Sequence, residues 1–161
     1  MATNAELADR FEEFADRLEA KGVEYKPRSY RQAAENIREY PRPVADLAAE
    51  GEDAIQEIEG VGDAIAAKAI EYLETGRIAE LDDLREELPA DVEALTAVEG
   101  VGPKTVGALY EALGVTDLDD LEAAARDGEI RDVSGFGEKS EAKILENIPF
   151  ARESQERELL G

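Results

Sequence analysis

Residues 98–113 read VEGVGPKTVGALYEAL, and two other stretches repeat this pattern without gaps. Residues 58–73 read IEGVGDAIAAKAIEYL, and residues 133–148 read VSGFGEKSEAKILENI. Each stretch holds an apolar residue, one spacer, a Gly-apolar-Gly turn and then an amphipathic helix. A short helix is predicted before each turn, over 53–58, 91–98 and roughly 129–133. The repeat therefore predicts three helix-hairpin-helix units.

Apolar residues recur at helical spacing outside the repeats as well. The clearest examples are Leu7, Phe11, Phe14 and Leu18, followed by Tyr30, Ala33, Ala34 and Ile37. Asn4 is predicted to cap the first helix, and Pro41-Arg42-Pro43 is predicted to end the second, because proline cannot continue the helical hydrogen-bond ladder. No stretch alternates with period two for long, so we predict an all-α fold.

The segment between the first two repeats predicts a domain boundary. Gly76 is a plausible helix stop, and Pro89 interrupts the helical pattern that follows. We expect two small helical domains: a first over 1–80 that ends in the first hairpin, and a second over 90–149 that contains the other two. Residues 150–161 form a polar tail, which we interpret as the start of a further domain.

Composition excludes several kinds of chemistry. The 161 residues include no cysteine and no histidine, so disulfides, zinc fingers and imidazole catalysis are ruled out. Asp117, Asp119 and Asp120 are predicted to be helix-start carboxylates rather than metal ligands. No long apolar run and no signal-peptide core is present, so we expect a cytoplasmic protein with no membrane contact.

The net charge of −22 argues against a nucleic-acid partner when taken alone, because phosphate binders usually carry a basic face. Two interpretations compete. The charge could be the solvating surface of a protein from a salt-loving organism, or the surface of an acidic protein-interaction module. Acidic residues are spread over the amphipathic helices and form no separate block, which favours the halophilic interpretation.

The glycine turns are suited to phosphate binding. Each second helix begins at a glycine, so unpaired N–H groups and the positive end of the helix dipole face an approaching ligand. A backbone without Cβ atoms can come close to a phosphate oxygen. The glycines concerned are Gly60, Gly62, Gly100, Gly102, Gly135 and Gly137. Val61, Val101 and Phe136 are expected to point inward and anchor the turns.

Alternatively, the hairpins could be merely corners between helices. The placement of lysines argues against this alternative for the three hairpins taken together. Lysine is scarce in this chain, yet Lys68 and Lys143 fall within the second helices, as do Lys104 and Lys139 just after the turns. Contacts of this kind go to the sugar-phosphate backbone and read no bases. The pattern therefore predicts DNA binding without sequence specificity.

The first domain resembles the amino-terminal lyase domain of family X DNA polymerases. Residues 26–34 read KPRSYRQAA and precede the first hairpin at the distance found in that family, with Tyr40-Pro41 between them and Leu73, Thr75 and Gly76 after it. The second hairpin resembles the one in the thumb or fingers subdomain, and the third is similar to a bacterial and archaeal version. The resemblance covers roughly Ala5 to Ile148.

This resemblance implies a gapped or nicked DNA substrate, with one hairpin at the downstream 5′-phosphate and the next at the primer side. It implies no required cofactor, but it does suggest a K⁺ or Na⁺ ion at hairpin carbonyls near Gly60 and Gly100. The nucleotidyl-transfer palm is missing, and we expect it to follow in the full-length protein. The chain alone is expected to be a monomer that does not polymerise.

The resemblance also implies a second function, a 5′-deoxyribose-phosphate or abasic-site lyase. Lys68 aligns with the lysine that forms a Schiff base with the sugar aldehyde, after which β-elimination releases the sugar. Lys26 and Tyr30 match the 5′-phosphate pocket. Ala64 and Glu80 stand where well-known members have cations, and Tyr25 replaces a histidine. These departures favour DNA binding over lyase chemistry for Lys68.

Overall fold

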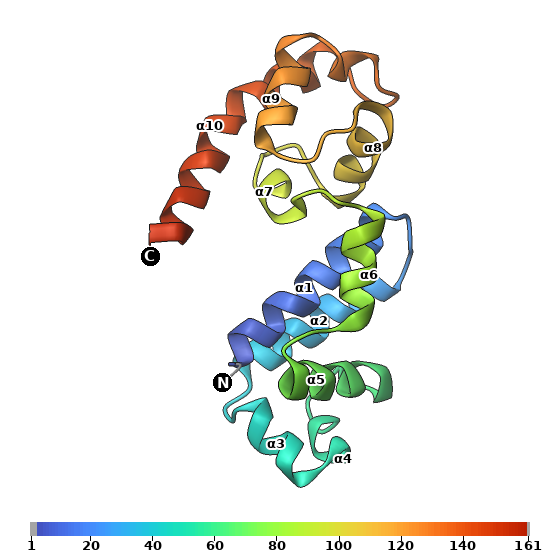
Figure 1. Ribbon diagram of the computed structural model, residues 1–161, viewed down its shortest axis with the longest axis vertical. Helices are drawn as coiled ribbons and strands as arrows, with labels where there is room; N and C mark the ends of the chain where they lie inside the picture. Colours follow the sequence, from blue (N-terminus) through green and yellow to red (C-terminus); the bar gives the residue numbers. More distant parts are fainter. Residues whose placement is uncertain (1–2, 161) are drawn as a thin grey trace. The chain divides into compact units, whose positions relative to one another are not determined.

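The computed structural model describes residues 3–160, with side chains through residue 156. Every regular element within this range is a helix, which confirms the all-α prediction. The chain divides into two compact units (Figure 1). Unit 1 holds the residues up to Glu19 together with Val23–Glu87, and unit 2 holds Ala20–Gly22 together with the residues from Leu88 on.

Unit 1 is built on two helices that lie side by side. The two helices pack against each other through Phe14 and Tyr30, whose ring centroids are 4.5 Å apart. Four shorter helices follow and include the first hairpin (Figure 1). The helices are α1 (Asn4–Ala20), α2 (Lys26–Glu39), α3 (Val44–Glu50), α4 (Glu52–Ile55), α5 (Asp63–Thr75) and α6 (Ala79–Glu87).

The predicted apolar faces of α1 and α2 form the core of unit 1. All eight residues of the two helical patterns are buried, at 9 % exposure or less. The predicted helix ends are confirmed as well. Helix α2 stops before Pro41, with Tyr40 in an extended conformation, as expected for a residue that precedes proline. Gly76 ends α5 in the left-handed conformation, at φ 77°.

The cap predicted for α1 is wrong. The Thr3 hydroxyl accepts the N–H of Glu6 and caps the helix. The Asn4 side chain instead accepts the Val44 N–H at 2.8 Å and donates to the Arg42 carbonyl at 2.9 Å. Asn4 therefore fixes the start of α3, a contact between residues forty positions apart that local sequence rules do not address.

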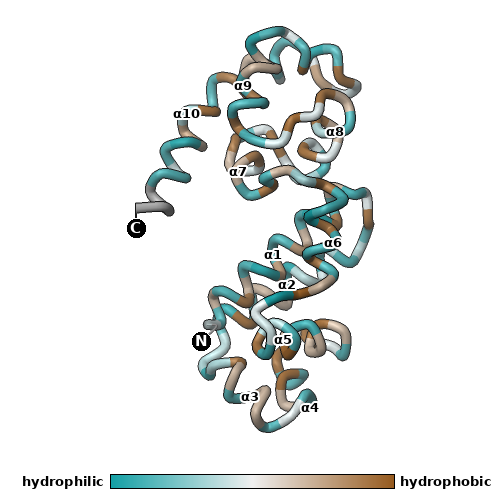
Figure 2. Tube along the Cα trace, viewed as in Figure 1, coloured by the Kyte–Doolittle hydropathy of each residue, from teal (hydrophilic) through white to brown (hydrophobic). Residues whose placement is uncertain are grey.

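Unit 2 contains the second and third hairpins. Its helices are α7 (Val92–Thr96), α8 (Pro103–Leu113), α9 (Leu118–Arg126), the 3₁₀ turn η1 (Ile130–Asp132) and α10 (Glu138–Leu160). Leu95, Leu109, Leu121 and Ile144 are among its fully buried residues. Hydrophobic residues recur among hydrophilic ones along these helices (Figure 2). Among the described residues, no helix has the length and apolar character needed to cross a membrane.

The first helix of each hairpin is shorter than the sequence pattern predicts. Helix α4 ends at Ile55 and α7 at Thr96, and the third is a single 3₁₀ turn. Each ends early because the chain must reach its glycine turn, where successive N–H groups bond three residues back instead of four. Residues 150–160, which the sequence set apart as part of a tail, continue α10 beyond Pro149.

Candidate nucleic-acid interface

The first glycine of each hairpin is required by the turn itself. Gly60, Gly100 and Gly135 have φ angles of 86°, 96° and 90°, a region that residues with a Cβ rarely adopt. In the first two hairpins this turn brings the N–H of Val61 to the Ile58 carbonyl at 3.1 Å and that of Val101 to the Val98 carbonyl at 3.0 Å. These glycines shape the hairpins whether or not a ligand binds.

The second glycine is not required by the chain's own conformation. Gly62 has φ −96° and Gly102 has φ −101°, both with extended ψ, which any residue can adopt. A Cβ added at Gly62, Gly102 or Gly137 would meet no atom within 4 Å. The bare backbone at these three positions is therefore available to a molecule from outside.

The N–H groups that follow the second glycine lie at the open start of a helix. The hydrogen-bond ladders begin with Ala66 N–H to the Gly62 carbonyl at 2.9 Å and Val106 N–H to the Gly102 carbonyl at 3.0 Å. The N–H groups of the preceding turn have no partner in the ladder. Neither α5 nor α8 has a side-chain cap at this end. Both ends can therefore donate to an acceptor such as a phosphate oxygen.

The residues between the glycines anchor the turns, as predicted. Val61 and Val101 are 4 % and 5 % exposed. Phe136 is half-buried and packs against the core of unit 2. The turns are thus held by apolar packing below, while the glycines remain at the surface.

The three hairpins differ in charge at the start of the second helix. The first turn of α5 contains Asp63, and that of α10 contains Glu138 and Glu141. The first turn of α8 contains no acidic residue, and Lys104 there is exposed. A carboxylate at a helix start compensates the positive dipole, so α8 keeps more of its attraction for an anion.

The third hairpin is held together by an ion pair. Glu141 is 3 % exposed and accepts from the Arg131 N–H at 3.0 Å and from Arg131 Nη2 at 2.7 Å. The hydrogen bonds from the Arg131 side chain hold the pKa of the Glu141 carboxyl below its ordinary value. Arg131 also pairs with Glu138 at 3.2 Å. This arginine therefore ties the 3₁₀ turn to α10.

Acid is expected to open the third hairpin. Because the folded pKa of Glu141 is lowered, its contribution to stability is complete above the unfolded value near 4.5 and is lost as pH falls through the folded pKa. The amide NMR signals of Gly135 and Gly137 should therefore move with a midpoint below 4.5. Glu141→Gln should remove this transition. A midpoint at or above 4.5 would contradict the role of the pair.

The Lys68 side chain lies among two aromatic rings and one carboxylate of unit 1. Its side chain is 13 % exposed, and its Nζ is 3.6 Å from Glu80 Oε1. The same nitrogen lies 5.6 Å from the Phe14 ring centroid and 5.9 Å from that of Tyr30. Glu71 lies on the same helix as Lys68, and its carboxylate accepts the Ala79 N–H at 2.9 Å and fixes the start of α6.

Lys26 and Tyr30, the predicted partners of Lys68 in a phosphate pocket, differ in exposure. Lys26 is exposed at the start of α2. Tyr30 is 7 % exposed and packs with its ring in the core, which leaves the hydroxyl as its only group able to serve a ligand. In unit 2, Lys139 is exposed, and Lys143 lies 3.9 Å from Glu99 of the second hairpin.

Tyr25 is a surface feature that the sequence pattern did not reveal. Its φ of 71° and ψ of −51° place it at the centre of a γ-turn, closed by Lys26 N–H to the Glu24 carbonyl at 2.8 Å. Such turns are strained for residues with a side chain. The Tyr25 side chain is 87 % exposed. No local rule predicts a tyrosine in this conformation.

Side-chain ligands for a metal do not gather anywhere in the described part of the chain, where no three carboxylates are grouped as a metal site. Asp117 caps α9 by accepting the Asp120 N–H at 2.8 Å, and Asp120 accepts the Thr116 hydroxyl at 2.7 Å. The helix-start role predicted for these two carboxylates is confirmed.

Comparison with known proteins assigns both units to one structural class. Residues 2–78 match the helix-hairpin-helix domain family, and residues 92–148 match the family of SAM-like helix-hairpin-helix tandems. The chain is therefore a tandem helix-hairpin-helix protein region.

The relatives specify the family further. The chain is 30 % identical over 145 residues to the DNA polymerase/3′-5′ exonuclease PolX of Bacillus subtilis (strain 168), covering 89 % of the chain and 25 % of that protein. It is 26 % identical over 122 residues to DNA polymerase lambda of Rattus norvegicus, covering 76 % of the chain and 20 % of that protein. The chain is homologous to the N-terminal helix-hairpin-helix region of family X DNA polymerases and spans about a quarter or less of these relatives.

Proposed function

We propose that this chain binds gapped or nicked DNA through backbone phosphates at its glycine hairpins, without reading base sequence. The observation that carries the proposal is the second glycine of each hairpin. Gly62, Gly102 and Gly137 have open space where a Cβ would lie and no positive φ. A glycine that the fold does not need, at the start of a helix, is suited to close approach by a phosphate oxygen.

The second hairpin supplies the strongest phosphate contact in this proposal. Its helix start has no acidic residue in the first turn and no side-chain cap, and Lys104 adds an exposed positive charge. The first and third hairpins keep the same backbone but place Asp63 and Glu138 beside the ligand. They serve as weaker contacts that extend the interface, with Lys139 as the cation of the third.

Tyr25 and Lys26 are suited to contact gapped DNA at the ends of the gap. Strained backbone that persists in a fold is common where a side chain must be held in a functional position. Here the strain holds an exposed ring beside the exposed Lys26. An aromatic ring next to a cation can stack on an unpaired base while the cation contacts a phosphate. We assign the unpaired template base to Tyr25 and the 5′-phosphate to Lys26, with Tyr30 beneath it.

Removing the 5′-phosphate from a gapped duplex is expected to weaken binding by about ten- to a hundredfold, the value of one charge-assisted contact. Changing the bases that flank the gap should have little effect. Fluorescence anisotropy with matched duplexes measures both. Lys26→Ala should abolish the dependence on the 5′-phosphate, whereas Arg42→Ala, which removes an exposed arginine of the same unit, should retain it. Equal affinity for both duplexes would remove the first-hairpin pocket from the proposal.

A monovalent cation at the hairpin turns remains a prediction. Backbone carbonyls are hard oxygen donors of the kind that K⁺ and Na⁺ accept. In the first hairpin the Glu59 carbonyl already accepts the Asn36 amide at 2.7 Å, whereas within the described residues no protein donor bonds the Glu99 carbonyl of the second. The turn near Gly100 therefore fits such an ion better than the turn near Gly60. A bound cation would reduce the electrostatic repulsion between the acidic protein and the DNA phosphate.

High salt is the condition under which we propose that this chain works. Five arginines each pair with two carboxylates, which organises part of the excess acid into small clusters: Arg31, Arg38, Arg85, Arg131 and Arg152. The remaining acid is spread over exposed helix faces. Salt screens the repulsion between such charges within a few ångströms. The alternative, an acidic protein-interaction module, rests on net charge alone.

A lyase reaction at Lys68 is the second candidate function. The shielded amine among aromatic rings is a suitable setting for a neutral amine that attacks the sugar aldehyde, loses water and forms an imine. Removal of the C2′ proton to a base then breaks the C3′–O bond, so that the DNA leaves with its phosphate, and water hydrolyses the remaining imine to release the sugar and free the lysine. The Glu80 carboxylate at 3.6 Å opposes this chemistry, because an amine in an ion pair has no free electron pair for attack.

Borohydride trapping on 5′-deoxyribose-phosphate DNA is expected to give weak or no adduct with this chain, while DNA binding is intact. Any adduct should disappear in Lys68→Ala and weaken in Lys26→Ala. Ala64→Lys, one turn before Lys68, should increase trapping by adding a like charge and a phosphate partner. Strong trapping that depends on Lys68 would make the chain a lyase. Strong trapping that persists in Lys68→Ala would show that another lysine reacts.

A further inference from the structure

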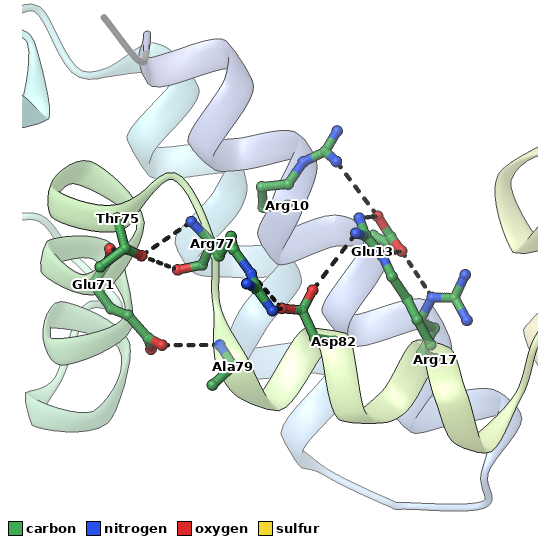
Figure 3. A network of polar contacts seen from close by, with 9 residues as sticks. Arg10, Glu13, Arg17, Glu71, Thr75, Arg77, Ala79 and Asp82 are labelled. Atoms are coloured by element: carbon green, nitrogen blue, oxygen red, sulfur yellow. Dashed lines mark hydrogen bonds and ion pairs between the residues drawn. The ribbon is translucent and has the colours of Figure 1, made fainter.

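A small pocket of unit 1, away from the hairpin glycines, gathers arginines in this strongly acidic chain. The pocket has a volume of about 90 Å³ and is formed by α1, the end of α5 and α6. Arg10, Arg77 and Arg85 line it together with Asp82, and the rest of the lining is Tyr72, Gly76, Ile78 and Leu81. Figure 3 shows Arg10, Arg77 and Asp82 of this lining, together with polar contacts of neighbouring residues. The lining holds three arginines against Asp82, and the Glu13 carboxylate pairs with Arg10 and Arg85, which leaves one arginine charge in excess.

Two of the arginines are already held by acids. Arg85 donates from Nε and Nη2 to the two oxygens of Glu13, both at 2.7 Å. Arg77 donates to Asp82 Oδ2 at 2.6 and 2.9 Å. Arg17 also donates to Glu13, at 2.8 Å. Burial raises the pKa of the Glu13 carboxyl, but the hydrogen bonds from Arg85 and Arg17 outweigh it and leave this pKa lowered.

Arg10 is held less closely. Its Nη1 forms an ion pair with Glu13 Oε1 at 3.6 Å, longer than a hydrogen bond (Figure 3), and its Nε is buried and has no hydrogen-bond partner. A second, larger pocket lies between α1 and α2. There, by contrast, Arg31 and Arg38 each pair with two carboxylates. A buried donor without a partner is costly and calls for an acceptor that the protein does not supply.

We propose that this pocket binds a phosphate-type oxyanion, with Arg10 as its main ligand and Arg77 and Arg85 at its sides. A guanidinium group offers a fork of donors that matches such an oxyanion. The volume has room for one tetrahedral anion with some water. Arg77 is 75 % exposed and can turn from Asp82 toward the anion. Two sources share this chemistry: free phosphate, and a phosphate of a DNA strand bound to unit 1.

Inorganic phosphate is the probe for the first test. At constant ionic strength, exchanging KCl for about 50 mM phosphate should raise the melting temperature of the chain by at least about 3 °C. Arg10→Gln should remove this rise and is expected to fold, because Glu13 keeps Arg17 and Arg85. Arg77→Gln, at the exposed rim, should reduce it. Arg42→Gln, an exposed arginine of unit 1 outside the pocket, should respond as the parent does.

Gapped-DNA binding by the same variants distinguishes the two sources. If Arg10→Gln loses the phosphate response but binds DNA as Arg42→Gln does, the site takes free phosphate. If it also loses several-fold more DNA affinity than Arg42→Gln, the site takes a strand phosphate. A parent melting temperature that phosphate does not change, or an equal response in Arg10→Gln, would overturn the proposal. Either result would leave DNA binding at the hairpins untouched.

Discussion

Replacing Gly102 with alanine is expected to weaken binding of gapped DNA at least about tenfold, the equivalent of 1.4 kcal/mol, while the melting temperature stays unchanged or rises slightly. The added Cβ meets no protein atom, and φ at Gly102 is −101°, so the folded chain is not strained. The same methyl group lies where a phosphate oxygen must approach the start of α8. Anisotropy titration and thermal unfolding of the same preparation measure the two effects separately.

Gly100→Ala is the matched control for this prediction. Gly100 has φ 96°, so alanine there should cost about 1 kcal/mol of stability through backbone strain. The two neighbouring glycines therefore separate the shape of the hairpin from its contact with DNA. If the folded Gly102→Ala chain binds gapped DNA as tightly as the parent, the second hairpin is only a corner between helices.

Raising KCl from about 0.1 M to about 2 M is expected to increase the melting temperature by about 10 °C or more. The 40 acidic residues outnumber the 18 basic ones, so screening of repulsion should outweigh the weakening of exposed ion pairs. DNA affinity should first rise with salt and then fall, because counterion competition takes over. Circular dichroism melts across a KCl series measure the first effect. A melting temperature that is flat or falls with salt would refute the halophilic interpretation.

The sequence was sufficient for the parts of the fold that depend on local pattern. Three copies of Gly-apolar-Gly in one register predicted the hairpins, and helical spacing predicted the cores of α1 and α2. These signals are local because a helix face repeats every few residues and a positive φ selects glycine. The same reasoning overestimated the length of the first helix of each hairpin, because helical spacing does not show where a turn must begin.

The details of the candidate sites depend on contacts between residues that are distant in the sequence. Local sequence patterns do not predict such contacts. Glu80 reaches Lys68, whereas Glu71, on the same helix as Lys68, fixes the start of α6 instead. Asn4 bonds Val44 rather than its own helix. The strained turn at Tyr25 follows from how the chain enters α2 and not from any preference of tyrosine. Side-chain direction across the fold decides the cases of Glu71, Glu80 and Asn4, and the path of the backbone decides that of Tyr25.

The central claim, that the glycine hairpins bind DNA backbone phosphate, is tested most directly by titrating a labelled gapped duplex with the chain over a series of KCl concentrations. We expect saturable binding with nearly equal affinity for duplexes of different base sequence, and an affinity that Gly62→Ala and Gly102→Ala together reduce by more than the roughly tenfold effect of Gly102→Ala alone. Absence of saturable binding at every KCl concentration, or full affinity in the folded double variant, would contradict the claim.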